Sequence, residues 1–393
     1  MTAFEQSQME TILSELPRYR AAAEAIKGTL LANLALLGEI PAATFEEKGR
    51  IELLLERFKQ NALEDVARDG AGNGMAVIPG RQPGPPILIL AHADTVFSNE
   101  VDHTISIEQD TAMGPAVADN SIALATLPTL PDLIQQLDLR FESDIVLLGA
   151  AQGLGRADLH GIRHYLNHTN NTFRAAVCLE GVQLGRMSLA SIGMLRGEVH
   201  CSVPEEYDWT RFGTGGAIFD LNEVINRLVE IRLPKRPRSS IVLGSIRSGS
   251  SFNTAATHGV LRFEIRSESE AMVEEIRLQV DDIVTEVNSA TNAELTLNVL
   301  ARRTPGGLSS SHPLARTART ILRALHVQPR LAPSTSELSA LIDRGIPGVT
   351  IGLTTGQHVN RPDERIQIEP IFTGLAQLIG IIKAVDQGIC DED

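Results

Sequence analysis

The most constraining feature of the sequence is the stretch ILILAHADTV at residues 87–96, where an apolar run leads directly into polar residues. A continuous apolar run flanked by Pro and Gly predicts a strand that is buried on both faces, as in a parallel sheet. His92 and Asp94 then lie at the carboxyl end of this strand, where open α/β sheets place their ligands. An imidazole can bind a metal ion, and a carboxylate two residues later can share the ion or orient the ring. Because H-x-D is a weak motif, an ordinary polar strand end is the alternative interpretation.

Strands and helices alternate through the first half of the chain. Two further continuous apolar strands are predicted at residues 144–149 (DIVLLG) and 175–179 (AAVCL). We expect Thr44 to open one helix and Pro128 and Pro131 to break another. The helices predicted around these strands cover residues 9–37, 43–61, 121–137 and 160–167. This alternation predicts a mostly parallel sheet with helices on both faces.

The pattern changes near Gly193, where strands begin to alternate apolar and polar residues, as in an antiparallel sheet with one solvated face. The elements predicted here are strands at 197–203, 240–246, 260–265 and 295–300, and helices at 217–229 and 269–287. The α/β pattern returns after Thr304. The sequence therefore predicts an α/β domain of residues 1–193 and 304–393 that is interrupted by a smaller α+β domain, residues 194–303.

Composition limits the partners and the setting of the protein. The formal net charge of the 393 residues is −14, which argues against nucleic acid and anionic membranes as partners. Cys178, Cys201 and Cys390 follow no pairwise spacing pattern and are interpreted as thiols in a reducing compartment. The first residues lack the apolar run of a signal peptide, and no stretch approaches the length of a membrane span. We therefore expect a cytoplasmic protein.

Several short motifs occur in an order that is informative as a set. They are HADTV at 92–96, Asp119 after a glycine-containing loop, the run 148–161 that ends in Asp158-Leu159-x-Gly161, LEG at 179–181, GSSFNTA at 249–255, RGIP at 344–347 and PDERI at 362–366. Together they resemble the zinc-dependent exopeptidase and aminoacylase family, which includes carboxypeptidase G, tripeptidase-like enzymes and peptidase family M twenty. The resemblance implies a split α/β domain around two zinc ions and an inserted lid or dimerisation domain.

The resemblance also implies roles for individual residues. His92 matches the first histidine ligand, Asp94 its orienting partner and Asp119 the aspartate that bridges the two ions. Glu180 falls where the family has an Asp or Glu ligand. In the lid, Asn253 and Arg266 match residues that reach the substrate, so we expect them to bind it.

Other positions depart from the family pattern. The family's Glu-Glu pair, a catalytic base followed by a ligand, falls on Gly153-Leu154, or on Ala151-Gln152 in a second alignment. The last histidine ligand falls on Asn360, and the lid histidine that binds the substrate carbonyl falls on Tyr207. Loss of the base alone usually lowers the rate by about 10²–10⁴-fold.

These departures favour a family member with lost or strongly reduced amide-hydrolase activity. It would hold at most one weakly bound zinc ion, through His92, Asp119 and Glu180, and would act as a binding or regulatory protein or a scaffold. The alternative is an active metal-dependent peptidase or N-acyl-amino-acid hydrolase with a rewired site. In that case Glu205, Glu206 or Glu337 replaces the base and His358 the missing ligand; Glu337 lies in STSELS (334–339), where relatives carry a Ser-Thr-Asp-Ala-Asn-like segment.

The inserted lid domain is the part of the chain that we expect to form contacts between copies. Its strands can pair edge to edge with a second copy, since an exposed sheet edge is usually covered or used. The sequence therefore predicts a homodimer with twofold symmetry. A purely structural homodimer built on this sheet is a third interpretation. If the protein has a ligand, we expect a small peptide or an acylated amino acid.

Overall fold

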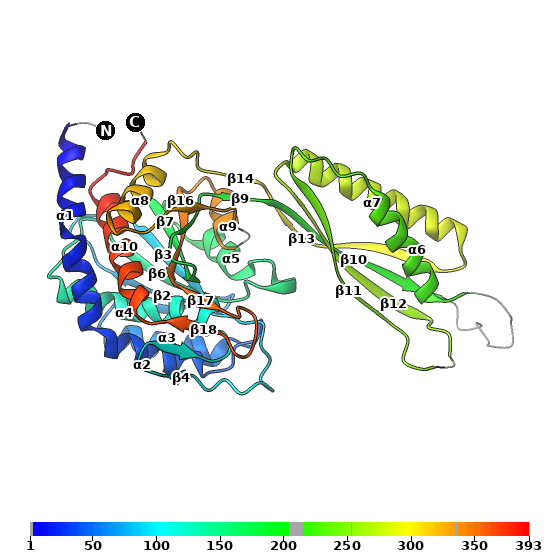
Figure 1. Cartoon of the computed structure of the whole chain (residues 1–393), viewed down its shortest axis with the longest axis horizontal. Helices are drawn as coiled ribbons and strands as arrows, with labels where there is room; N and C mark the ends of the chain where they lie inside the picture. Colours follow the sequence, from blue (N-terminus) through cyan, green and yellow to red (C-terminus); the bar gives the residue numbers. More distant parts are fainter. Residues whose placement is uncertain (1–2, 204–214, 253, 335, 393) are drawn as a thin grey trace. The chain divides into compact units, whose positions relative to one another are not determined.

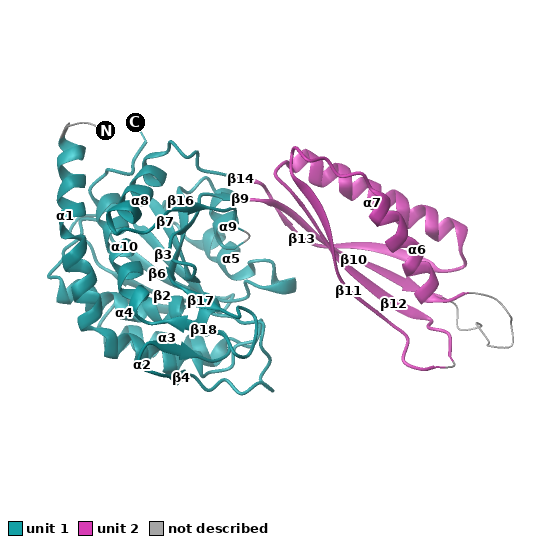
Figure 2. Ribbon diagram, in the orientation of Figure 1, with its two compact units in different colours: residues 1–190, 307–393 teal, residues 191–306 magenta. Residues whose placement is uncertain are grey.

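The chain divides into two compact units (Figure 2). The computed structural model describes residues 3–203, 215–252, 254–334 and 336–392. Residues 1–190 and 307–393 form the first unit, and residues 191–306 form the second. The second unit is therefore an insertion, because the chain leaves the first unit and later returns to it.

An eight-stranded sheet forms the centre of the first unit (Figure 1). Its order is β1-β2-β6-β3-β7-β16-β8-β15, and the neighbours β6, β3, β7 and β16 are parallel. The strands are β1 (Glu64–Arg68), β2 (Gly74–Ile78), β6 (Ile145–Ala150), β3 (Ile87–His92), β7 (Ala175–Val182), β16 (Gly348–Thr354), β8 (Arg186–Ser188) and β15 (Arg330–Leu331). Every residue of β3, β6 and β16 is buried, as continuous apolar runs predict.

Helices cover both faces of this sheet, and β3 shows how its side chains are shared between them. Ile87 and Ile89 pack in the large core with helices such as α2, α4 and α10, whereas Leu88 and Leu90 pack in a second core with α5 and α9. The helices are α1 (Ala3–Ala25), α2 (Lys27–Gly38), α3 (Lys48–Gln60), α4 (Ile122–Gln136), α5 (His160–His168), α8 (Pro313–Ala324), α9 (Leu338–Ile342) and α10 (Glu369–Asp386). The predicted α/β class is confirmed.

Local expectations were wrong at three helices. The predicted helix over 9–37 is two helices, α1 and α2. Thr44 does not open α3, which begins at Lys48; its hydroxyl donates instead to Asp94 Oδ2 at 2.9 Å. Helix α4 runs unbroken through Pro128 and Pro131 because it is buried along most of its length, and tertiary packing overrides the local preference.

The second unit is a four-stranded antiparallel sheet with two helices on one face. Its order is β11-β12-β10-β13, so β11 and β13 are the edges. The elements are β10 (Gly193–Ser202), β11 (Ser239–Ser248), β12 (His258–Ser267), β13 (Glu294–Arg303), α6 (Ala217–Glu230) and α7 (Glu270–Ala290). Apolar residues of the sheet and both helices form a core of its own.

Short elements complete the first unit and the connections. A small sheet is made of β4 (Ser106–Ile107), β5 (Thr111–Met113), β17 (Gly356–Gln357) and β18 (Arg365–Gln367). The strands β9 (Ala190–Ser191) and β14 (Gly306–Gly307) pair where the chain passes between the units, and η1 (Val117–Ser121) and η2 (Gly155–Ala157) are single turns. Within the described residues, no single helix has the length and apolarity to cross a membrane; α1 and α2 meet that test only as a pair bent by 58°.

Candidate metal centre

Two neighbouring parallel strands bring His92 and Glu180 to one face of the large sheet. Leu90 lies two residues before His92 on β3, and Cys178 lies two residues before Glu180 on β7. These two apolar residues are direct neighbours across the strands and pack in the core with α5 and α9. Because side chains alternate along a strand, His92 and Glu180 follow them on the same face.

The third side chain, Asp119, comes from the turn η1 before α4. The amide of Asn120 fixes this turn against β7: it donates to Leu179 O at 2.9 Å and accepts from the N–H of Gly181 at 2.7 Å. The N–H of Asp119 donates to Glu364 Oε2 at 3.2 Å, as does that of the preceding residue at 2.8 Å. Segments distant in sequence therefore hold the carboxylate of Asp119 toward the strand ends.

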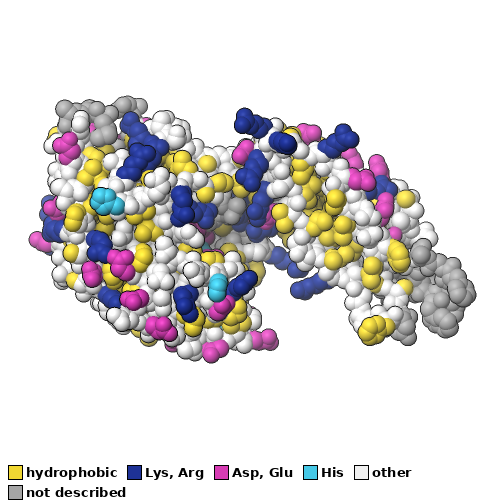
Figure 3. Space-filling model, viewed as in Figure 1, with side chains coloured by type: hydrophobic (Ala, Val, Ile, Leu, Met, Phe, Trp, Pro, Cys, Tyr) yellow, Lys and Arg dark blue, Asp and Glu magenta, His cyan; other side chains and the backbone are white. Residues whose placement is uncertain are grey.

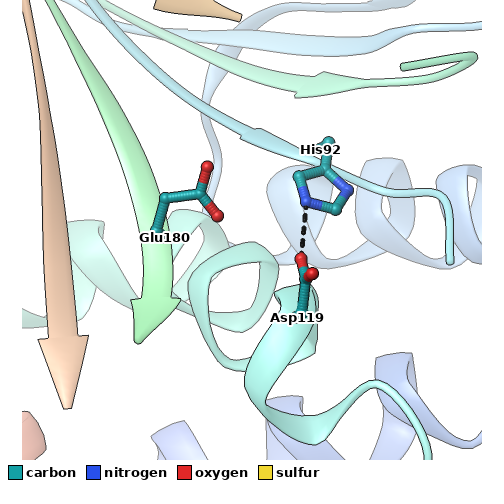
Figure 4. A group of neighbouring side chains, drawn as sticks. All are labelled: His92, Asp119 and Glu180. Atoms are coloured by element: carbon teal, nitrogen blue, oxygen red, sulfur yellow. Dashed lines mark hydrogen bonds and ion pairs between the residues drawn. The ribbon is translucent and has the colours of Figure 1, made fainter. Parts of the chain in front are cut away.

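The potential ligand atoms of His92, Asp119 and Glu180 all lie within 4.8 Å of one another (Figure 4). His92 Nε2 is 3.0 Å from Asp119 Oδ1. One imidazole nitrogen and two carboxylate oxygens are ligands that zinc accepts, and three protein ligands leave a coordination position open, as in catalytic zinc sites. The donor set therefore fits one divalent cation.

Asp94 contacts the other side of the His92 ring. His92 Nδ1 is 3.0 Å from the carbonyl oxygen of Asp94 and 3.3 Å from its Oδ1. Asp94 Oδ2 accepts hydrogen bonds from Thr44 and from the N–H groups of Gly153 and Leu154, at 2.8–3.0 Å. This fully buried carboxylate therefore fixes both the imidazole and the loop after β6, as carboxylates that orient metal-bound histidines do.

Burial and neighbouring charges shift the pKa values of this cluster. Burial lowers the pKa of His92, but hydrogen bonds to Asp119 and Asp94 and the charge of Glu337 outweigh it and leave the pKa well above its ordinary value. Desolvation raises the pKa of Glu180 to about 8, and it raises that of Glu364 to about 7. Without a cation, this cluster therefore tends to retain protons.

Among the described residues, none of the positions that depart from the family pattern brings a carboxylate or an imidazole to the site with its own side chain. The N–H groups of Gly153 and Leu154 donate hydrogen bonds to Asp94. The N–H of Ala151 donates to the side-chain oxygen of Asn73 at 2.9 Å. Asn360 is exposed, and its N–H donates to Glu364 Oε1 at 2.7 Å.

His358 does not join the cluster. Its Nδ1 pairs with Asp363 at 2.7 Å, and both side chains are about half exposed. The hypothesis that His358 supplies a ligand is therefore not supported by this arrangement.

Several predicted residues belong to the second unit or lie outside the described residues. Arg266 pairs with Glu264 at 2.5 Å on the sheet of the second unit. Tyr207, Asn253, Glu205 and Glu206 lie outside the described residues.

Sequence reasoning gave no role to two residues that support the site. Asn120 and Glu364 hold the Asp119 turn through hydrogen bonds, and both are buried. A polar residue directly after Asp119 was the available signal for the first, and the position of Glu364 within PDERI was the signal for the second.

No protein-family model matches the sequence, and no curated protein does. Solved structures do match. A tripeptidase from Staphylococcus aureus aligns with a TM-score of 0.73 at 18% identity, over 92% of this chain and 99% of that one. The di-peptidase Dug1p from Saccharomyces cerevisiae aligns with a TM-score of 0.74 at 12% identity, over 95% and 98%.

A Bacillus subtilis protein described as a dinuclear metal binding peptidase from the M20 family aligns with a TM-score of 0.64 at 15% identity, over 92% of this chain and 98% of that one. The chain has the fold of the M20 metallopeptidases. The predicted resemblance is thus confirmed for the fold of both domains. Sequence identities of 12–18% do not establish the chemistry, which depends on the residues of the site.

Proposed function

We propose that this protein is a metal-dependent hydrolase of amide bonds in small peptides or acylated amino acids. His92, Asp119 and Glu180 hold one divalent cation, for which zinc is the first candidate. The observation that carries the proposal is the grouping of these three ligand atoms within 4.8 Å at the carboxyl ends of β3 and β7. The peptidases that share the fold support the choice of substrate class.

The position of each residue in the site determines its role. A bound zinc ion supplies a Lewis acid and lowers the pKa of water. Asp94 holds the His92 ring, while Glu364 and Asn120 hold the turn that carries Asp119. Each contact fixes a ligand before the cation arrives, and such support typically changes metal affinity by about 10–100-fold.

We expect one bound ion rather than two, and turnover below that of a two-metal enzyme. Gly153-Leu154 and Asn360 stand where the family pattern has its base and further ligands, and none of them offers a metal-binding side chain. The same observation favours the second candidate function, a binding or regulatory protein that has lost amide hydrolysis.

Metal binding and turnover test the proposal together. Calorimetry on protein freed of metal by a chelator is expected to give one zinc per chain, and Glu180→Gln is expected to weaken binding by at least about 100-fold. Glu56→Gln, on the exposed face of α3, is the matched control. Zinc-loaded protein is then assayed on dipeptides and N-acetylated amino acids. Absence of zinc binding overturns the proposal, and binding without hydrolysis favours the second candidate.

We also propose a homodimer assembled through the second unit. Support comes from the edge strand β11, where Val242, Leu243 and Ile246 are 37–46% exposed. Hydrophobic side chains gather on the face of this unit seen in Figure 3.

We also propose a cytoplasmic setting. The three cysteines support it, because all of them are free and buried.

A further inference from the structure

A carboxylate from a distant element fills the space beside Gly153. A Cβ atom placed on Gly153 would lie 3.0 Å from Glu337 Oε1 and 3.2 Å from Asp94 Oδ1. The side chain of Glu337 is buried, and so is Asp94 Oδ1, which lies 3.3 Å from His92 Nδ1 but accepts no hydrogen bond of normal geometry among the described residues. The volume that a side chain at position 153 would enter is thus occupied by the carboxylate of residue 337.

Packing of α9 delivers Glu337 to this place. Glu337 immediately precedes α9, and Leu338 and Leu341 of that helix are fully buried in the core with Leu90 and Cys178. This is the core on the sheet face that His92 and Glu180 share. The backbone carbonyl of Glu337 accepts a hydrogen bond from the N–H of Ala340 at 3.0 Å. This bond fixes the turn that carries the Glu337 side chain.

Electrostatics agrees with this placement. The charge of Glu337 raises the pKa of His92, of Glu180 and of Cys178, although burial is the larger influence on each. A single carboxylate that acts on all three groups lies close to the ends of both β3 and β7.

We infer that Glu337 is the proton-transferring carboxylate of this site, supplied by α9 in place of a side chain at position 153. The inference rests on the proposed function. Water adds to the carbonyl carbon of the amide while the Glu337 carboxylate accepts its proton. The same carboxyl group then gives this proton to the amide nitrogen as the C–N bond breaks, which releases a carboxylic acid and an amine.

The first test separates proton transfer from metal binding. Glu337→Gln keeps the shape of the side chain but cannot accept a proton, so kcat should fall by about 10²–10⁴-fold while zinc affinity by calorimetry changes little. Acetohydroxamate gives a readout without turnover, because it chelates a metal as its anion and leaves its proton on a nearby base. Its affinity for the zinc-loaded variant should fall at least tenfold. Asp343→Asn, at the end of α9, is the matched control.

The second test moves the carboxylate back. Gly153→Glu alone places two side chains in one space and should lower both thermal stability and activity. In the double variant Gly153→Glu with Glu337→Ala the contact with Glu337 is removed and only the 3.2 Å approach of the new Cβ to Asp94 Oδ1 remains, so stability and at least a tenth of the activity should return. This rescue distinguishes a functional carboxylate from one that only fills space, since Glu337→Ala alone should stay inactive.

The outcomes separate this inference from the proposed function. If Glu337→Gln binds zinc and acetohydroxamate and hydrolyses amides as the wild type does, the inference is overturned and the proposed function stands. If the wild type binds zinc and hydroxamate without hydrolysing any amide, and Glu337→Gln loses only the hydroxamate, the proposed function fails and the proton-accepting role of Glu337 stands. A wild-type chain that binds no zinc overturns both.

Discussion

At the scale of single residues, burial determines how the polar groups of this protein behave. The cysteines show this most simply, because none of them belongs to the metal centre. Burial raises the pKa of Cys201 to about 11 and that of Cys390 to about 12, and it raises the pKa of Cys178 well above its ordinary value. The thiolate is the reactive form of cysteine, so both its scarcity and its inaccessibility protect these residues.

We therefore predict that the folded protein resists thiol reagents. At about pH 8, where an ordinary cysteine is already partly ionised, dithiobis-nitrobenzoate should label less than one thiol per chain within minutes. All three thiols should react after unfolding in guanidinium, and labelling of the folded chain should become faster as pH rises toward the raised pKa values.

An introduced surface thiol provides the control for that measurement. Asn170→Cys, in the exposed loop after α5, should react within seconds to minutes under the same conditions. Fast reaction of two or more native cysteines in the wild-type chain would contradict the burial on which the prediction rests.

The same scale separates what the sequence predicted at the site from what it did not. His92 and Glu180 lie at the ends of apolar runs that only a buried strand accommodates, so their position followed from local pattern. The proximity of Glu337 to Gly153 follows from the packing of α9 on the sheet. The sequence offered Glu337 only as one of three glutamates, because no local pattern measures a distance across 184 positions.

At the scale of elements, Arg50 joins three segments behind the metal centre. This fully buried guanidinium extends from α3 and donates to the carbonyl oxygens of Gly38, Ile40 and Ala93 at 2.6–3.1 Å. These carbonyls belong to the end of α2, the following loop and the residue after β3. Burial lowers the pKa of Arg50 to about 10, although Asp94 and Glu47 oppose this effect, so the side chain stays charged at neutral pH.

Arg50→Met should therefore destabilise the protein by at least about 3 kcal/mol. Methionine fills much of the space but leaves these buried carbonyls without the donor, and each hydrogen bond to a charged group contributes about 1.5–3 kcal/mol. Urea unfolding followed by fluorescence and circular dichroism measures the loss. Lys59→Met, on the exposed side of the same helix, should stay within about 0.5 kcal/mol of wild type. Equal stability of the two variants would show that Arg50 does not hold these segments together.

Helix positions followed from the sequence better than helix ends did. The apolar period of α3 was visible, but its first residue was not, because Thr44 uses its hydroxyl on Asp94 instead of capping the helix. The two prolines of α4 do not break it as the sequence predicts, because packing against its neighbours buries most of the helix. Local signals therefore predicted which elements exist, and tertiary contacts determined where they begin and whether they continue.

At the scale of the whole molecule, the change of strand pattern near Gly193 was the most informative signal. The apolar strands form the sheet of the first unit, which is covered by helices on both faces. The alternating strands form the sheet of the second unit, which packs against helices on one face only. Each unit therefore has its own core, and an antiparallel sheet of four strands necessarily leaves two edges. The edges bear on assembly, because unpaired backbone groups and exposed apolar side chains invite another strand.

The edge strand β11 carries exposed apolar side chains. Val242 and Ile246 are 43% and 46% exposed, and an edge strand with exposed apolar side chains is a template for pairing with another chain. We expect sedimentation at micromolar concentration to give twice the chain mass of 42.5 kDa, and Val242→Glu with Ile246→Glu to shift the protein to monomer, because two buried carboxylates without partners oppose association. Leu278→Glu, at an exposed apolar position of α7, should leave the dimer intact. A wild-type monomer at that concentration would overturn the proposed homodimer.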